Sequence, residues 1–192
     1  MKRTLTGASS DGGRGLGVRQ VPLSTLSLVV GQAVTYLLQQ VNETSELERR
    51  LQAMGRRVGF RTFDLYCLRF GVQKRELRIV PFLQFVADKI WRSWFGHAAE
   101  VLKGENEYQL ADINKNVFHS AVSTTECNLG SYVAGMVEGL LLVAGFSNQT
   151  TFVRVTAHHH YPQAQPGAAL PLGPNVQRGL ILGIELMPRS DG

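Results

Sequence analysis

The sequence of 192 residues predicts an α+β fold, and three observations support this class. The chain begins with segments whose apolar residues recur every three or four positions, as on one face of a helix. Shorter apolar runs bounded by turn-forming residues follow, as expected of strands. One further helical segment lies between these runs. Leading helices, a small antiparallel sheet and an interposed helix together indicate an α+β domain.

Length and composition favour one domain. A chain of 21.2 kDa with 44% hydrophobic and 18% charged residues can bury one sizeable core. Residues 1–20 are rich in Gly, Ser and Arg without apolar periodicity, and we expect them to be a disordered basic tail. Residues 21–192 are expected to form a single domain, with a Pro- and Gly-rich loop at 162–177.

Two helices are expected near the N-terminus. The first begins near Ser24, and the second opens on Ser45 with Glu48 three positions later, the pattern of a capping box. Their apolar stripes are Leu26, Val29, Val30, Ala33, Leu37 and Val41 on the first, and Leu47, Leu51, Met54 and Val58 on the second. Gly55 and Gly59 share one face of the second helix, although each costs about 1 kcal/mol of helix propensity. Another element must therefore approach that face closely.

The remaining elements follow from similar signals. A third, aromatic helix is expected from Val80 to Phe95, with Gly96 as its stop, and a short helical stretch around 98–102. Residues 108–113 and 117–122 flank Asn-Lys-Asn and predict a hairpin. A fourth helix is expected from about Leu129 to Val143, ended by Gly145, and strands at 151–161 and 179–187. The inward residues of the fourth helix are predicted to be Ala134, Val137, Leu141 and Leu142.

Charge is unevenly distributed along the chain. Residues 1–92 hold 15 Lys and Arg against 7 acids, a net +8, whereas residues 93–192 hold 5 against 8, a net −3. A basic face can meet nucleic acid, an anionic membrane or an acidic protein, or can simply be a solvated helix surface. Nucleic acid is disfavoured because the basic residues lie on predicted helices and the tail, not among aromatic residues on a sheet.

Three consecutive histidines, His158 to His160, raise the possibility of a metal site. On a strand, side chains alternate, so His158 and His160 share the polar face with Arg154, and His159 points the other way. No spacing nominates a third ligand from His97, His119 or the acids. We therefore interpret the histidines as the exposed end of a strand, with metal binding as the alternative, and expect no cofactor.

Signals for catalysis and targeting are weak. The sequence has no Gly-x-Ser-x-Gly elbow, Cys127 has no indicated base, and Ser131 lies in a helix that looks structural. Cys67 and Cys127 form no C-x-x-C pair, which fits a reducing cytosol. We expect no secretory signal, because no apolar run follows the basic N-terminus before Val21, and no membrane span.

Three stretches resemble one known family. Residues 54–64, MGRRVGFRTFD, resemble its signature of a glycine, three residues, a glycine, one residue and an arginine, here Gly55, Gly59 and Arg61, followed by Asp64. Residues 89–99, KIWRSWFGHAA, are similar to its third helix, which ends at Gly96. Residues 127–141, CNLGSYVAGMVEGLL, with Ala134 and Gly135, are similar to its fourth helix and lead to VTAHHH at 155–160. The family is that of the mixed α/β small subunits of TRAPP, the trafficking protein particle that tethers vesicles.

The resemblance implies a fold and a function. Helices would pack on one side of a small twisted antiparallel sheet of about four strands. The chain would be a non-catalytic scaffold subunit in endoplasmic reticulum to Golgi transport, within a complex that exchanges nucleotide on a Rab GTPase. It would be cytoplasmic and peripheral at Golgi and endoplasmic reticulum membranes. A heterodimer with the family's lipid-carrying subunit would form through the first two helices, at Leu26, Val29, Val30, Ala33, Leu37, Leu51, Met54 and Val58.

The sequence departs from the family pattern in places. The acyl chain of the lipid-carrying subunit sits on a cysteine in the loop after the second helix, whereas Cys67 lies earlier, on the helix, so we expect no lipidation here. The tail and the 162–177 loop exceed the family pattern and receive no function from it. The alternative is a small-molecule-binding regulatory domain of the vinyl-reductase type, which shares the fold but would favour cysteines near the C-terminus, where residues 180–189 have none.

Overall fold

A computed structural model describes residues 23–72, 76–104, 107–113, 127–160 and 179–188. The expected tail, the 162–177 loop and the expected strand at 117–122 lie outside the described residues. The helices are α1 (Leu23–Leu38), α2 (Thr44–Arg69), α3 (Ile79–Phe85), the π-helix η1 (Val86–Trp91), α4 (Arg92–Phe95) and α6 (Gly130–Ala144). The strands are β1 (Glu100–Lys103), β2 (Tyr108–Asp112), β3 (Thr151–His160) and β4 (Gly179–Pro188).

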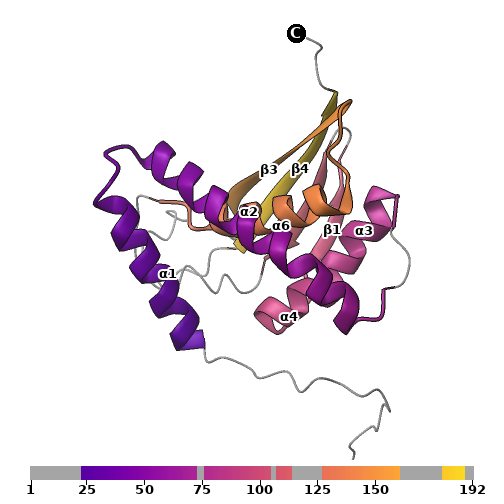
Figure 1. Ribbon diagram of the computed structural model, residues 1–192, viewed down its shortest axis with the longest axis horizontal. Helices are drawn as coiled ribbons and strands as arrows, with labels where there is room; N and C mark the ends of the chain where they lie inside the picture. The colour runs from indigo at the N-terminus through magenta and orange to yellow at the C-terminus, as the bar shows by residue number, and fades with distance from the viewer. Residues whose placement is uncertain (1–22, 73–75, 105–106, 114–126, 161–178, 189–192) are drawn as a thin grey trace, which may run out of the picture.

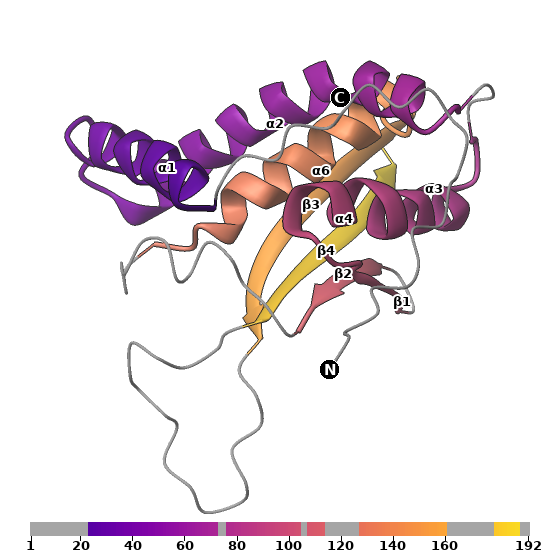
Figure 2. The same ribbon diagram turned by 90° about the horizontal axis from the view of Figure 1, so that it is seen from below.

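The four strands form one antiparallel sheet in the order β1-β2-β4-β3. The helix α6 lies along one face of the sheet and α2 lies across α6 on its far side (Figure 2). The continuous helix made of α3, η1 and α4 lies beside α6 on the same side, and α1 packs against α2 at the periphery (Figure 1). The predicted α+β class, with helices on one side of a four-stranded sheet, is confirmed.

Two expectations for the middle of the chain are wrong. The stretch at 98–102 is not helical, because Gly96 takes a left-handed φ of 81° that ends α4, and the chain leaves it extended into β1. The hairpin partner of β2 is therefore β1, with Val101 opposite Leu110, and the other edge of β2 pairs with β4.

The expected capping box on α2 is also wrong. Glu43 holds the N-cap position, and Ser45 lies inside the helix. Glu48 turns away from the helix terminus, and its Oε1 accepts a hydrogen bond from the backbone N–H of Asn128 at 2.8 Å. A second bond, from Asn128 Nδ2 to the carbonyl of Ala157, measures 2.8 Å. The carboxylate expected to cap α2 instead anchors the segment that leads into α6.

The paired glycines on α2 are explained by α6. A Cβ at Gly55 would fall on the carbonyl oxygen of Tyr132, and one at Gly59 on that of Met136. The relation is reciprocal, because a Cβ at Gly135 on α6 would fall on the carbonyl of Gln52. The two backbones therefore touch, and the prediction of a close approach at this face is confirmed.

The strand β3 alternates as predicted. Val153 and Val155 are buried, whereas Arg154 and His158 are exposed. On α6, Ala134, Val137 and Leu141 are buried as expected, but Leu142 is only half-buried, because it lies at the edge of the contact with α2. Gly145 ends the helix in the left-handed conformation, at φ 84°.

The core also holds a polar cluster that sequence patterns did not predict. The carboxylate of Asp112 on β2 is buried and accepts hydrogen bonds from Trp91 Nε1 at 3.1 Å and from His97 Nε2 at 2.8 Å. Buried carboxylates need such partners, since an unpaired one is strongly disfavoured. The cluster joins the end of the aromatic helix to the sheet.

Candidate interaction surface

The helix α1 carries apolar side chains on two faces. Val30, Val34 and Leu37 are buried, with the three- and four-residue spacing of one helix face, and belong to the core with Leu47 and Leu51 of α2. Apolar residues on the outer side of α1 are exposed: Leu28 at 64%, Val29 at 61%, Tyr36 at 60% and Leu38 at 50%. A grouped set of this kind on one helix is typical of a surface that another protein covers.

The structure narrows the predicted interface. Val30, Leu37 and Leu51 lie in the core of this chain, so they are corrected from contact residues to core residues. Val30 and Leu37 of α1 pack in the same core as Leu51 of α2. The periodicity of an apolar stripe does not tell whether the stripe packs within the chain or against a partner. Of the others, Val29 and Met54 are exposed, Ala33 and Val58 are half-buried, and the side chain of Leu26 lies outside the described residues.

Exposed apolar residues continue along α2. Beyond Met54, they are Phe60, Leu65 and Leu68, the last at 72%. Apart from Val29, the outer residues of α1 and these residues of α2 were not predicted, because they lie off the single apolar stripe assigned to each helix. The signal was present, since Leu28, Tyr36 and Leu38 are apolar positions off the α1 stripe. The α1–α2 surface is defined here as Leu28, Val29, Tyr36, Leu38, Met54, Leu65 and Leu68.

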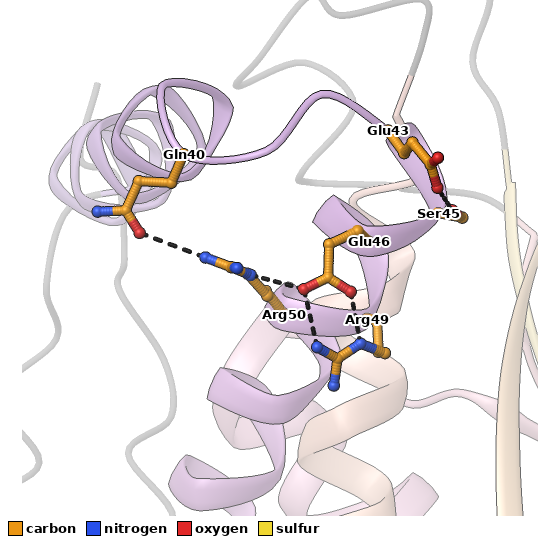
Figure 3. A network of polar contacts seen from close by, with 6 residues as sticks. All are labelled: Gln40, Glu43, Ser45, Glu46, Arg49 and Arg50. Atoms are coloured by element: carbon orange, nitrogen blue, oxygen red, sulfur yellow. Dashed lines mark hydrogen bonds and ion pairs between the residues drawn. The ribbon is translucent and has the colours of Figure 1, made fainter.

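The first turns of α2 are held by a charge network (Figure 3). Glu46 accepts hydrogen bonds from Arg49 Nε at 2.7 Å and from Arg50 Nε at 2.8 Å, and Arg50 also reaches Gln40 at 3.3 Å. The hydrogen bond from Arg49, followed by that from Arg50, lowers the pKa of Glu46 to about 2. The charges of both arginines are therefore largely neutralised locally.

A second polar contact ties α2 to α6 and the sheet. Gln52 Nε2 donates to Glu138 Oε2 at 2.9 Å and to the carbonyl of Val155 at 3.0 Å, and Arg56 Nη1 lies 3.4 Å from Glu138 Oε1. Glu138 is buried on α6, where an unpaired carboxylate would be costly. Arg61 and Asp64 of the sequence signature are exposed on α2, and Gly96 ends α4.

Metal binding finds no support among the described residues, where no three His, Cys, Asp or Glu side chains gather. His158 Nε2 lies 3.0 Å from Thr156 Oγ1 on the same strand. Among the described helices, none is both long and apolar enough to cross a membrane.

The family model of the transport protein particle (TRAPP) component matches residues 26–169, which include most of α1 and all of α2, α6 and β3. The chain belongs to the TRAPP component family. Similar curated relatives are trafficking protein particle complex subunit 5 of Dictyostelium discoideum, 30% identical over 74% of this chain and 78% of that protein, and of Homo sapiens, 31% identical over 73% and 76%. The predicted resemblance to TRAPP small subunits is confirmed, and both of these relatives are subunit 5.

A solved TRAPP structure supports the fold. Trafficking protein particle complex subunit 3 from Naegleria fowleri, covalently bound to palmitic acid, superposes with a TM-score of 0.64 over 88% of this chain and 98% of that one, at 18% identity. At this identity the likeness concerns the fold alone.

The two cysteines of this TRAPP chain are poor nucleophiles as they stand. Burial, and then the negative charge of Glu48, raise the pKa of the Cys127 thiol from 9.0 to about 11. Burial, and then Asp64, also raise the pKa of Cys67. Thiolates are the reactive form of cysteine, so a raised pKa lowers reactivity.

We therefore expect Cys127 to react slowly with iodoacetamide at pH 8. The shift from 9.0 to about 11 leaves roughly 100-fold less thiolate at Cys127 than in an unfolded chain. Mass spectrometry of alkylated peptides, with and without denaturant, measures the ratio. Equal labelling rates in the folded and unfolded chains would contradict this description of the site.

Proposed function

We propose that this chain is a non-catalytic scaffold subunit of a TRAPP vesicle-tethering complex. In this role it holds neighbouring small subunits in position, and the assembled complex promotes nucleotide exchange on a Rab GTPase in endoplasmic reticulum to Golgi transport. Membership of the TRAPP component family supports the complex, and the exposed α1–α2 surface supports a role in assembly. The complex would place the chain peripherally at Golgi and endoplasmic reticulum membranes.

The α1–α2 surface is the observation that carries the proposal. It offers large apolar side chains on two helices that are themselves anchored, α2 by its backbone contact with α6 and α1 by Val30, Val34 and Leu37. Anchored helices present a preformed surface, and little conformational entropy is lost when a partner covers it. The proposed first partner is the lipid-carrying small subunit, which would present its own corresponding helices.

A nucleotide-exchange assay tests the scaffold role. We expect the purified chain alone to leave the rate of fluorescent GDP release from the cognate Rab at the spontaneous value. Complex purified from cells depleted of this chain should lose exchange activity, and adding the chain back should restore it. Robust exchange by the chain alone, or full activity of the depleted complex, would refute a non-catalytic scaffold.

A further inference from the structure

A small open pocket lies on α2 where this helix crosses α6. Its volume is about 210 Å³, its floor is apolar, and its lining residues are Arg56, Arg57, Phe60, Arg61 and Leu142. The backbones touch beside it, because a Cβ at Gly139 would strike the carbonyl of Arg56 and the amide nitrogen of Phe60. The helix crossing therefore fixes the backbone beside the pocket, and the side chains of α2 and Leu142 form its walls.

The charges around the pocket are not balanced. Arg49 and Arg50, earlier on the helix, are bound to Glu46 (Figure 3), and Arg56 contacts Glu138. Arg57 and Arg61 are exposed and form no ion pair with any residue that the structure describes. They lie four residues apart, so their side chains project from the same face of the helix. The pocket thus combines an apolar floor with two uncompensated guanidinium groups.

We infer that this pocket docks a short acidic segment of a partner protein. One apolar side chain of the segment would fill the space between Phe60 and Leu142, and flanking carboxylates would bind Arg57 and Arg61. The planar guanidinium fork matches a carboxylate in two parallel hydrogen bonds. Apolar anchors seated in preformed pockets, with arginines beside them, are what carry binding energy at protein interfaces.

A protein segment fits the pocket better than a lipid surface does. An anionic membrane attracts a broad basic face, but the neighbouring Arg49 and Arg50 are already paired with Glu46. A concave site with an apolar floor selects a single inserted side chain instead.

The docking pocket borders the surface proposed for pairing. Arg57 lies three residues from Met54 and Arg61 lies four residues from Leu65, so both arginines stand at the edge of that surface. Phe60 lies about 200° from Val58 around the axis of α2 and faces away from it. The inference rests on the charge and shape of the pocket residues and not on the proposed pairing.

Fluorescence anisotropy with the full chain, together with any subunits that accompany it, tests the inference. The probe is a labelled synthetic peptide with a Phe-Leu pair between runs of Asp and Glu. We expect saturable binding that weakens by about tenfold or more in the double variant Arg57→Glu and Arg61→Glu, and equally in Phe60→Ser. The peptide with Ser-Ser in place of Phe-Leu should weaken to a similar extent.

A charge-matched control separates the pocket from net charge. Lys103→Glu with Arg154→Glu changes the net charge equally on exposed strand positions and should alter affinity by less than about twofold. If circular dichroism shows that the charge reversal unfolds the chain, the double variant Arg57→Gln and Arg61→Gln replaces it in the binding assay. Absence of saturable binding, or equal loss in the control, would overturn the inference. Capture of phosphatidylserine vesicles that depends on Arg57 and Arg61, without peptide binding, would also overturn it and assign the pocket to membrane.

Discussion

Replacing Gly59 with Val should destabilise the fold by about 3 kcal/mol or more. A Cβ at this position would occupy the space of the Met136 carbonyl, so the α2 and α6 backbones must separate. Overpacking of this kind costs about 1–3 kcal/mol and sometimes more, even where side chains can move aside. Here the obstacle is backbone that is itself hydrogen-bonded within α6, and the cost should lie at the upper end or beyond.

Urea denaturation followed by circular dichroism measures the loss. Leu68→Val is the matched control, because it places the same β-branched side chain at an exposed position of the same helix. Surface substitutions of this type usually change stability by about 0.5 kcal/mol or less. Unchanged stability in Gly59→Val would mean that the two helices are not in backbone contact.

The double substitution Val29→Asp and Tyr36→Asp should abolish pairing and leave the chain folded. Both residues are exposed on α1, at 61% and 60%, and lie seven residues apart on one face of the helix. In the proposed heterodimer each would bury apolar area worth about 1.5–3 kcal/mol, and an aspartate there would be an unpaired ion in an apolar contact. The expected loss of affinity is about 100-fold or more.

Co-expression with the lipid-carrying subunit and a pull-down measures pairing. Arg154→Asp, on the exposed face of β3, is the control and should pair normally. Circular dichroism of the double variant should match that of the unaltered chain. Undiminished pairing of a folded double variant would exclude the α1 face as the contact. The substitutions Val30→Asp and Leu37→Asp would not serve, because both residues are buried within this chain and charges there would unfold it.

Much of the fold could be predicted from local patterns. Gly96 and Gly145 ended their helices as expected, since only glycine readily takes a left-handed conformation there. The alternation of Val153, Arg154 and Val155 identified a half-buried strand and its faces. The cost of Gly55 and Gly59 in a helix predicted a close neighbour, which is α6.

The sequence-based predictions that were wrong concern features decided by tertiary contacts. Residues 100–103 are too short a segment for periodicity to distinguish a strand from a helix, and their pairing with β2 decides it. Ser45 and Glu48 have capping-box spacing, but the Glu48 carboxylate instead accepts a hydrogen bond from the backbone N–H of Asn128, 80 residues away. The buried or exposed state of the α1 stripe could not be read from the sequence, because one apolar face looks the same whether α2 or another chain covers it.

The most direct measurement of the central claim is affinity purification of the tagged chain from its native cell, followed by identification of stoichiometric partners by mass spectrometry. The proposed function predicts other TRAPP small subunits, with the lipid-carrying subunit in equimolar amount and lost selectively from the Val29→Asp and Tyr36→Asp variant. Recovery of the chain as a folded monomer, or in a stoichiometric complex that contains no TRAPP subunit, would contradict it.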